Sequence, residues 1–117
     1  MFHIVDKLAL MPLGEFEQLV LFALVRLGDD AYGAAIRREI EHRARRRLGI
    51  SAVYTTLERL EDKKLVRSWM GEPTGERGGR RRKYFALTPA GARALGDAYS
   101  SFAEMTAGLE RRLRTLS

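Results

Sequence analysis

The chain has 117 residues, 45% of them hydrophobic, which suits one compact unit or one small domain with an assembly element, but not two independent cores. The formal net charge of +6 favours a polyanionic partner, without separating DNA from RNA, acidic protein or anionic lipid. The absence of cysteine excludes disulfide bonds, thiolate zinc sites and a cysteine nucleophile.

The amino-terminal segment is apolar but short. Asp6 and Lys7 interrupt it, so it is unlike a signal peptide, and no apolar run in the chain approaches the roughly 18 residues of a membrane span. We therefore expect a cytoplasmic protein with no membrane partner.

Two helices are predicted next. The first runs from Glu15 to Leu27, where apolar residues at helical spacing cover most of the circumference, so it is expected to be central and buried. Gly28 marks its end. The second helix is predicted over roughly Tyr32 to Leu48, with Gly49 ending it.

A third helix is predicted with Ser51 as its N-cap and with Val53, Leu57 and Leu60 on its inward face. The short connection Leu48–Ile50 predicts a helix-turn-helix, which projects the first half of the third helix outward. A core helix with a merely solvated outer face is the alternative. The small outward residues favour entry into a DNA major groove. The contacts predicted there are Ser51, Ala52, Thr55, Thr56 and Arg59.

A β-hairpin is predicted after this helix, with strands over Leu65 to Glu72 and Lys83 to Thr88 around a glycine-rich turn. Five cations lie between Arg77 and Lys83 with no acid among them. Alone, such a run is often a solvated loop, but its place after a recognition-type helix predicts a DNA-binding wing. The wing contacts predicted are Arg77, Arg80, Arg81, Arg82 and Lys83.

The last predicted helix begins at Pro89, with Thr88 as its cap, and extends towards Leu116. Such a helix is about 40 Å long, more than a small three-helix domain can cover, so its apolar stripe predicts a dimer interface rather than packing on its own domain. The interface residues predicted are Leu95, Tyr99, Phe102, Met105, Leu109, Leu113 and Leu116. The predicted domains are therefore 1–88, which binds DNA, and 89–117, which dimerises.

Aromatic and sulfur-containing side chains suggest one further site. Trp69, Tyr99, Phe102 and Met105 are candidates to line a pocket for a flat apolar effector, although plain interface packing explains them as well. The two histidines, His3 and His42, lack metal-ligand spacing. No catalytic site, metal site or cofactor is expected.

Four segments in order resemble the PadR family of bacterial transcription regulators: LGEFEQLVLFAL, DAYGAAIRREIE, SAVYTTLERLEDKKLV and GRRRKYFALTPAG. The resemblance covers the chain from about Leu13 to the start of the last helix. It implies a homodimer that binds a pseudo-palindromic operator in double-stranded DNA and represses transcription until a small molecule, often aromatic or drug-like, releases it. The single helix after the wing makes this chain similar to the short form of the family.

The resemblance also assigns individual residues. It implies that the Tyr54 hydroxyl contacts a DNA phosphate, with Tyr32 as a second anchor. Two positions depart from the pattern, since many relatives have proline where Thr55 stands and glycine where Lys64 stands. If Lys64 adopts the left-handed conformation, it costs about 1 kcal/mol relative to glycine but places a further cation near the DNA backbone.

Together these features predict a mainly α fold with a small β-hairpin: a winged helix-turn-helix followed by a long C-terminal dimerisation helix. The leading functional prediction is a sequence-specific DNA-binding transcriptional regulator, a ligand-responsive homodimeric repressor. The alternative is a winged-helix module that binds an acidic protein partner and has only non-specific affinity for DNA.

Overall fold

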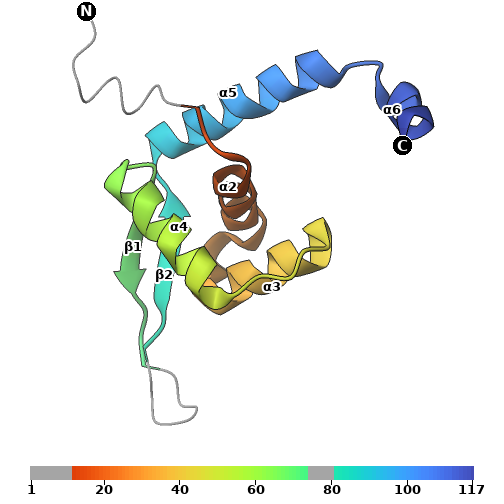
Figure 1. Cartoon of the computed structure of the whole chain (residues 1–117). Helices are drawn as coiled ribbons and strands as arrows, with labels where there is room; N and C mark the ends of the chain where they lie inside the picture. Colours follow the sequence, from red (N-terminus) through yellow and green to blue (C-terminus); the bar gives the residue numbers. More distant parts are fainter. Residues whose placement is uncertain (1–11, 74–80) are drawn as a thin grey trace, which may run out of the picture.

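A computed structural model describes residues 12–73 and 81–117 as five α-helices, a 3-10 turn and one β-hairpin (Figure 1). In chain order the elements are α2 (Glu15–Leu27), η1 (Gly28–Asp30), α3 (Gly33–Ala44), α4 (Ile50–Asp62), β1 (Val66–Met70), β2 (Lys83–Leu87), α5 (Pro89–Thr106) and α6 (Glu110–Leu116). The predicted fold class, a mainly α winged helix-turn-helix, is confirmed. No helix in the described ranges is both long and apolar enough to span a membrane.

Helix α2 is the centre of the core, as its nearly continuous apolar surface predicts. It packs against α3, α4, α5 and β2, and both Val20 and Leu21 are fully buried. The predicted inward face of the third helix is also confirmed, since Val53, Leu57 and Leu60 are all fully buried. Burial of these two stripes against each other fixes the orientation of α4, whose opposite face remains in solvent.

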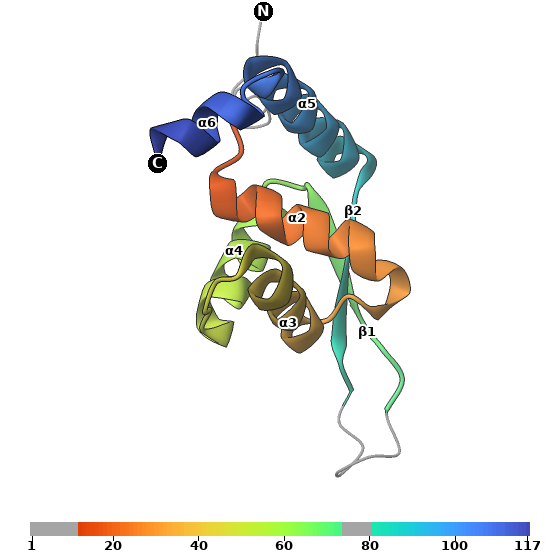
Figure 2. The same cartoon turned by 90° about the vertical axis from the view of Figure 1, so that its right-hand side faces the viewer.

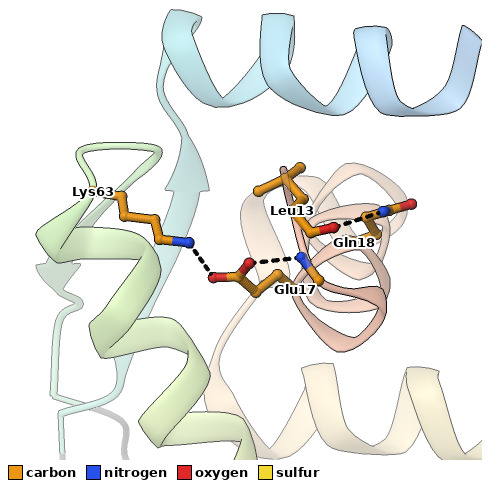
Figure 3. A network of polar contacts seen from close by, with 5 residues as sticks. Leu13, Glu17, Gln18 and Lys63 are labelled. Carbon is orange, nitrogen blue, oxygen red and sulfur yellow. Dashed lines mark hydrogen bonds and ion pairs between the residues drawn. The ribbon is translucent and has the colours of Figure 1, made fainter. Parts of the chain in front are cut away.

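A buried ion pair ties α4 to α2 (Figure 3). Lys63 Nζ donates a hydrogen bond of 2.8 Å to Glu17 Oε2, and the Gly14 amide donates one of 2.9 Å to Glu17 Oε1. Burial raises the pKa of Glu17, but the hydrogen bonds from Lys63 and Gly14 and the charges of Lys63 and Arg59 outweigh it, so the pKa lies below its ordinary value. The carboxylate is therefore ionised and held in place.

The connection between α3 and α4 differs from the prediction. Helix α3 ends at Ala44 rather than Leu48, because Arg45 adopts a left-handed conformation with φ of 54°. The chain beyond it is held by Glu41, whose carboxylate accepts a hydrogen bond of 3.0 Å from the Leu48 amide. Gly49, expected to end the second helix, is instead the N-cap of α4, so the prediction of Ser51 as N-cap is wrong.

The hairpin and its junctions follow the prediction closely. The strands pair antiparallel from Val66 opposite Leu87 to Met70 opposite Lys83. Lys64 has φ of 62°, so it adopts the left-handed conformation whose cost was considered above. The predicted Thr88 cap is confirmed. Its hydroxyl accepts a hydrogen bond of 3.0 Å from the Gly91 amide and donates one of 2.8 Å to the Lys64 carbonyl.

The prediction of one unbroken C-terminal helix is wrong. Helix α5 ends at Thr106, Gly108 has φ of 79°, and α6 begins at Glu110. Figure 2 shows α6 turned away from the line of α5. The break has a physical cause: Gly108 lies between exposed segments, so no core contact opposes its left-handed conformation, which glycine adopts without strain.

Candidate nucleic-acid interface

The solvent-facing side of α4 carries most of the residues predicted to read DNA. Ser51, Ala52, Thr55 and Arg59 are exposed. Thr56 is only 6% exposed, so the expectation that it faces outward is wrong. It follows Val53 by three residues and therefore shares the buried face of the helix. The exposed surface in the first two turns is thus small and polar.

Tyr54 lies against the start of α3. It is 40% exposed, and a Cβ atom added at Gly33 would overlap its hydroxyl and the adjoining ring carbon. The glycine thereby lets the phenol ring sit directly on the first turn of α3. The Tyr54 hydroxyl is consequently fixed at the junction between α3 and the recognition-type helix α4.

Three aromatic rings form what we call the wing-base cluster, made of Tyr32, Trp69 and Tyr84. Trp69 stacks on Tyr84 with ring centroids 6.0 Å apart, and Tyr32 meets Tyr84 edge to face at 5.9 Å. A backbone bridge joins Tyr32 to Tyr84, and the Phe85 amide donates a hydrogen bond of 2.9 Å to the Ala31 carbonyl. The cluster therefore locks the hairpin onto the start of α3.

Guanidinium groups surround this cluster. Arg82 lies over the Tyr32 ring at 4.2 Å, and Arg67 over the Trp69 ring at 4.8 Å. Arg38 donates a hydrogen bond of 3.0 Å to the Tyr32 hydroxyl. Contacts with the rings restrict these long side chains, which reduces the entropy lost when they bind an anion.

Sequence reasoning missed Arg38 and Arg67. A signal existed for Arg67, because residues two apart on a strand share a face, so its position two before Trp69 places it beside that ring. Arg38 lies on α3, six residues after Tyr32, which is the N-cap of that helix. No simple spacing rule predicts a contact between the two.

The rest of the predicted wing is described in part. Arg81 Nε donates a hydrogen bond of 2.8 Å to the Gly71 carbonyl, and the Gly71 amide donates one of 2.7 Å to the Arg82 carbonyl, which closes the base of the hairpin. Lys83 is exposed. Two predicted contacts, Arg77 and Arg80, lie outside the described residues.

Lys64 is not brought together with the start of α4. It is exposed, but it lies beyond the C-terminal end of the helix, which Figure 1 places near α5. Thirteen residues of helix separate the two ends by about 20 Å. Lys64 is therefore a candidate for a peripheral backbone contact only.

The structure does not bring the residues predicted for the dimer interface and the effector pocket together into one site. Leu95 is 5% exposed within its own core, so its assignment to an interface is wrong. Tyr99 meets Phe22 edge to face at 6.4 Å, whereas Trp69 belongs to the wing-base cluster, so the two do not share one set of neighbours. The remaining interface candidates are exposed: Phe102, Met105, Leu109, Leu113 and Leu116.

Residues 12–73 and 81–117 contain no group of three potential metal-ligating histidine, cysteine or carboxylate side chains. His42 is exposed on α3, and His3 lies outside the described part of the chain. The geometry instead combines an exposed helix face, a basic hairpin and ordered guanidinium groups, all of which suit nucleic acid.

Solved structures share this architecture. A PadR family transcription regulator from hypervirulent Clostridium difficile R20291 is 26% identical, with a TM-score of 0.70 over 86% of this chain and 99% of that one. The PadR family regulator from Eggerthella lenta DSM 2243 is 25% identical, with a TM-score of 0.62 over 96% and 94%. A structure described as the complex structure of hsRosR-SG is 28% identical, with a TM-score of 0.62 over 88% and 85%.

Among curated protein sequences, none matches the chain significantly. The family model described as the transcriptional regulator PadR-like family matches residues 20–97, which run from α2 through the recognition-type helix and the wing into α5. The PadR family regulators named above share the fold over 86% and 96% of this chain. The chain therefore belongs to the PadR-like family of transcriptional regulators, and the function implied by that membership is DNA-binding regulation of transcription.

Proposed function

We propose that the protein is a homodimeric repressor that recognises a pseudo-palindromic operator. The observation that carries this proposal is the exposed first half of α4, small and polar in its outward residues, beside a basic hairpin fixed by the wing-base cluster. Small side chains allow a helix to lie deep in the major groove, where hydroxyl and methyl groups meet base edges.

The DNA contacts divide between two structural parts. Ser51, Ala52 and Thr55 face the bases, while Tyr32 and Tyr54 hold phosphates through their hydroxyls. Arg59 reaches from the third turn of α4. The wing follows the DNA backbone and reaches towards the minor groove through its cations: Arg77, Arg80, Arg81, Arg82 and Lys83.

Dimerisation is assigned to residues 89–117, and DNA binding to residues 1–88. Support comes from the apolar side chains left in solvent along α5 and α6, of which Phe102 is 65% exposed and Met105 78% exposed. A contiguous apolar surface of this kind favours a second copy of the chain. Two-fold symmetry then sets the recognition helices about 34 Å apart, one turn of DNA.

A small aromatic or drug-like effector belongs to the same proposal. Tyr99, Phe102 and Met105 would line its site at the dimer interface, and binding there would change the separation of the two α4 helices. Trp69 is left out of this pocket because it stacks within the wing-base cluster.

The test is fluorescence anisotropy with DNA from immediately upstream of the protein's own coding region, against a scrambled duplex of equal length, over a salt series. We expect upstream DNA to bind at least about a hundredfold tighter at each salt concentration, since specific and non-specific affinity differ by large factors. Equal weakening of both duplexes would favour the module that binds an acidic protein instead.

A matched pair of variants sharpens the result. Ala52→Glu places a carboxylate on the face proposed to enter the groove, and Ala92→Glu places the same group on the exposed surface of α5. We expect Ala52→Glu alone to abolish the preference for upstream DNA, since a carboxylate close to phosphates is repelled.

A further inference from the structure

A second concentration of positive charge lies outside the wing. Four arginines occur between residues 43 and 47, at the end of α3 and in the segment leading to α4, and all four are exposed: Arg43, Arg45, Arg46 and Arg47. This cluster has no part in the contacts assigned above. Its position, directly before the recognition helix, raises the question of what it binds.

Ion pairing separates the four side chains into two sets. Arg43 pairs with Glu39 one turn earlier on α3, and Arg46 pairs with Glu15 at the start of α2. Arg45 and Arg47 have no ion-pair partner within residues 12–73 and 81–117. Arg46 thus fastens the loop to α2 and Arg43 is paired within α3, while Arg45 and Arg47 present their charge to solvent.

The loop has a defined conformation that displays these two residues. The Glu41 carboxylate accepts a hydrogen bond of 3.0 Å from the Leu48 amide, which fixes the far end of the loop. Arg45 is left-handed, with φ of 54° and ψ of 45°. Glycine at this position would avoid a cost of about 1 kcal/mol, so the chain carries an arginine side chain where the backbone conformation favours glycine.

An open surface pocket of about 620 Å³ lies beside this loop. The residues that line it include Arg45, Arg47, Glu41, Leu48 and Gly49. Gly49 is the N-cap of α4, so the loop leads directly into the turns proposed to enter the major groove. Figure 1 shows the hairpin on one side of α4 and this loop on the other. The recognition helix therefore lies between two basic surfaces.

We propose that Arg45 and Arg47 bind phosphates of the DNA backbone on the side of α4 away from the wing. This inference rests on the proposed function and extends it: the wing and the α3–α4 loop hold the two flanks of each half-site. Phosphate contacts fix the register and orientation of the protein and carry no sequence information. The two arginines therefore add affinity without adding discrimination between bases.

The experiment compares Arg45→Ala/Arg47→Ala with a control that removes the same charge elsewhere, Arg26→Ala/Arg93→Ala, whose residues are exposed on α2 and α5. Alanine retains the Cβ atom at position 45, so the backbone strain there is unchanged. Folding is checked by thermal melting. Binding of upstream and scrambled duplexes is then measured over a salt series.

Each phosphate contact contributes about 0.9 to the slope of log affinity against log salt. For Arg45→Ala/Arg47→Ala we expect the slope to become shallower by about 1.8 per bound subunit on both duplexes. The preference for upstream DNA should remain within about twofold of the wild type, because phosphate contacts carry no sequence information. The control should keep the wild-type slope, and Arg45→Lys/Arg47→Lys should retain most of it.

An unchanged slope in Arg45→Ala/Arg47→Ala, or an equal loss in the control, would overturn the inference. So would a collapse of the preference for upstream DNA, which would assign the two residues to base contacts. Failure of the proposed function looks different: the wild type itself would show no preference for upstream DNA, whereas the slope comparison would still report on these arginines.

Discussion

Glu17 shows most directly how a single residue positions the recognition helix. It is 6% exposed, and its two carboxylate oxygens accept hydrogen bonds from different segments: the Gly14 amide before α2 and Lys63 after α4. The carboxylate thus joins the start of the central helix α2 to the end of α4, the helix proposed to face DNA. A change here acts on both ends of the connection.

We expect Glu17→Gln to lower the free energy of unfolding by about 2 kcal/mol, because hydrogen bonds to charged groups are worth about 1.5–3 kcal/mol and Lys63 loses its counter-charge. Chemical denaturation measures this change. The control is Glu110→Gln, which breaks a pair with Arg114 whose two side chains are largely exposed. That control should cost no more than about 0.5 kcal/mol. Equal losses would show that burial of the Glu17 pair adds nothing.

The pH dependence follows from the lowered pKa of Glu17. Hydrogen bonds and nearby positive charges hold this pKa below 4.5, its ordinary value, despite burial. The stability contributed by the ionised carboxylate is complete above that pH and is lost as pH falls through the folded-state pKa. The gap in unfolding free energy between wild type and Glu17→Gln should therefore shrink on acidification below pH 4.5. Denaturation series at pH 7 and pH 3 would reveal a constant gap if the assignment is wrong.

Gly33 is the second residue with a specific positional role. Alanine there would overlap the Tyr54 phenol, so the ring must turn away from α3. We expect Gly33→Ala to weaken operator binding about fivefold for each bound subunit, as Tyr54→Phe should, since one hydrogen bond is worth about 1 kcal/mol. Anisotropy with upstream DNA measures the loss.

The control for that substitution is Gly96→Ala, made on α5 where an added Cβ meets nothing within 4 Å. It should bind DNA as the wild type does. Wild-type affinity in Gly33→Ala, with a displaced ring, would show that the position of the Tyr54 hydroxyl is unimportant for DNA binding.

The role of a residue could be predicted from the sequence where it depends on the residues next to it in the chain. Thr88 before Pro89 predicted a helix start correctly, because a cap depends on a few neighbouring residues. The left-handed conformation of Lys64 was raised only as a condition, from the glycine that many relatives have at that position. Thr56 and Leu95 were misplaced. Their burial depends on how whole helices are rotated and on which apolar stripe meets the core, and periodicity alone does not decide that.

At the scale of elements, glycine illustrates why helix ends are harder to predict. Gly96 and Gly108 both lie within the predicted C-terminal helix, but the helix continues through Gly96 and ends before Gly108. Leu95, beside Gly96, is buried in the core and anchors the surrounding turns. No such anchor adjoins Gly108. Tertiary contacts, absent from the local sequence, therefore decide which glycine remains helical.

This reasoning predicts the effect of Gly108→Ala. A Cβ atom makes the left-handed conformation about 1 kcal/mol less favourable, and alanine is about 1 kcal/mol better than glycine inside a helix. We expect α5 and α6 to merge into one helix through residues 107–109. Backbone NMR chemical shifts at these positions should become helical, while Ser101→Ala, within α5, should leave them unchanged. Persistently non-helical shifts would contradict this account of the break.

For the whole molecule, the proposed DNA-binding elements and the exposed apolar side chains of α5 and α6 lie at opposite ends. The hairpin and the start of α4 extend from one end, and α5 and α6 lie at the other (Figure 1). Helix α6 has seven residues, none of them buried. A helix that short is marginal in isolation, so contact with a second copy of the chain would stabilise it. The proposed dimer would supply such contacts.

The proposed dimer is tested by Phe102→Glu. In a two-fold interface each substitution occurs twice, and loss of a buried phenylalanine costs about 2 kcal/mol per copy, so the dimer dissociation constant should rise roughly a thousandfold. Sedimentation velocity measures that change. Operator affinity should fall with it, because each half-site is then bound by a separate subunit. Ser101→Glu, one residue away and also exposed, should dimerise normally if the stripe rather than general charge governs assembly. An intact Phe102→Glu dimer would remove α5 from the interface and leave its apolar surface to a different partner.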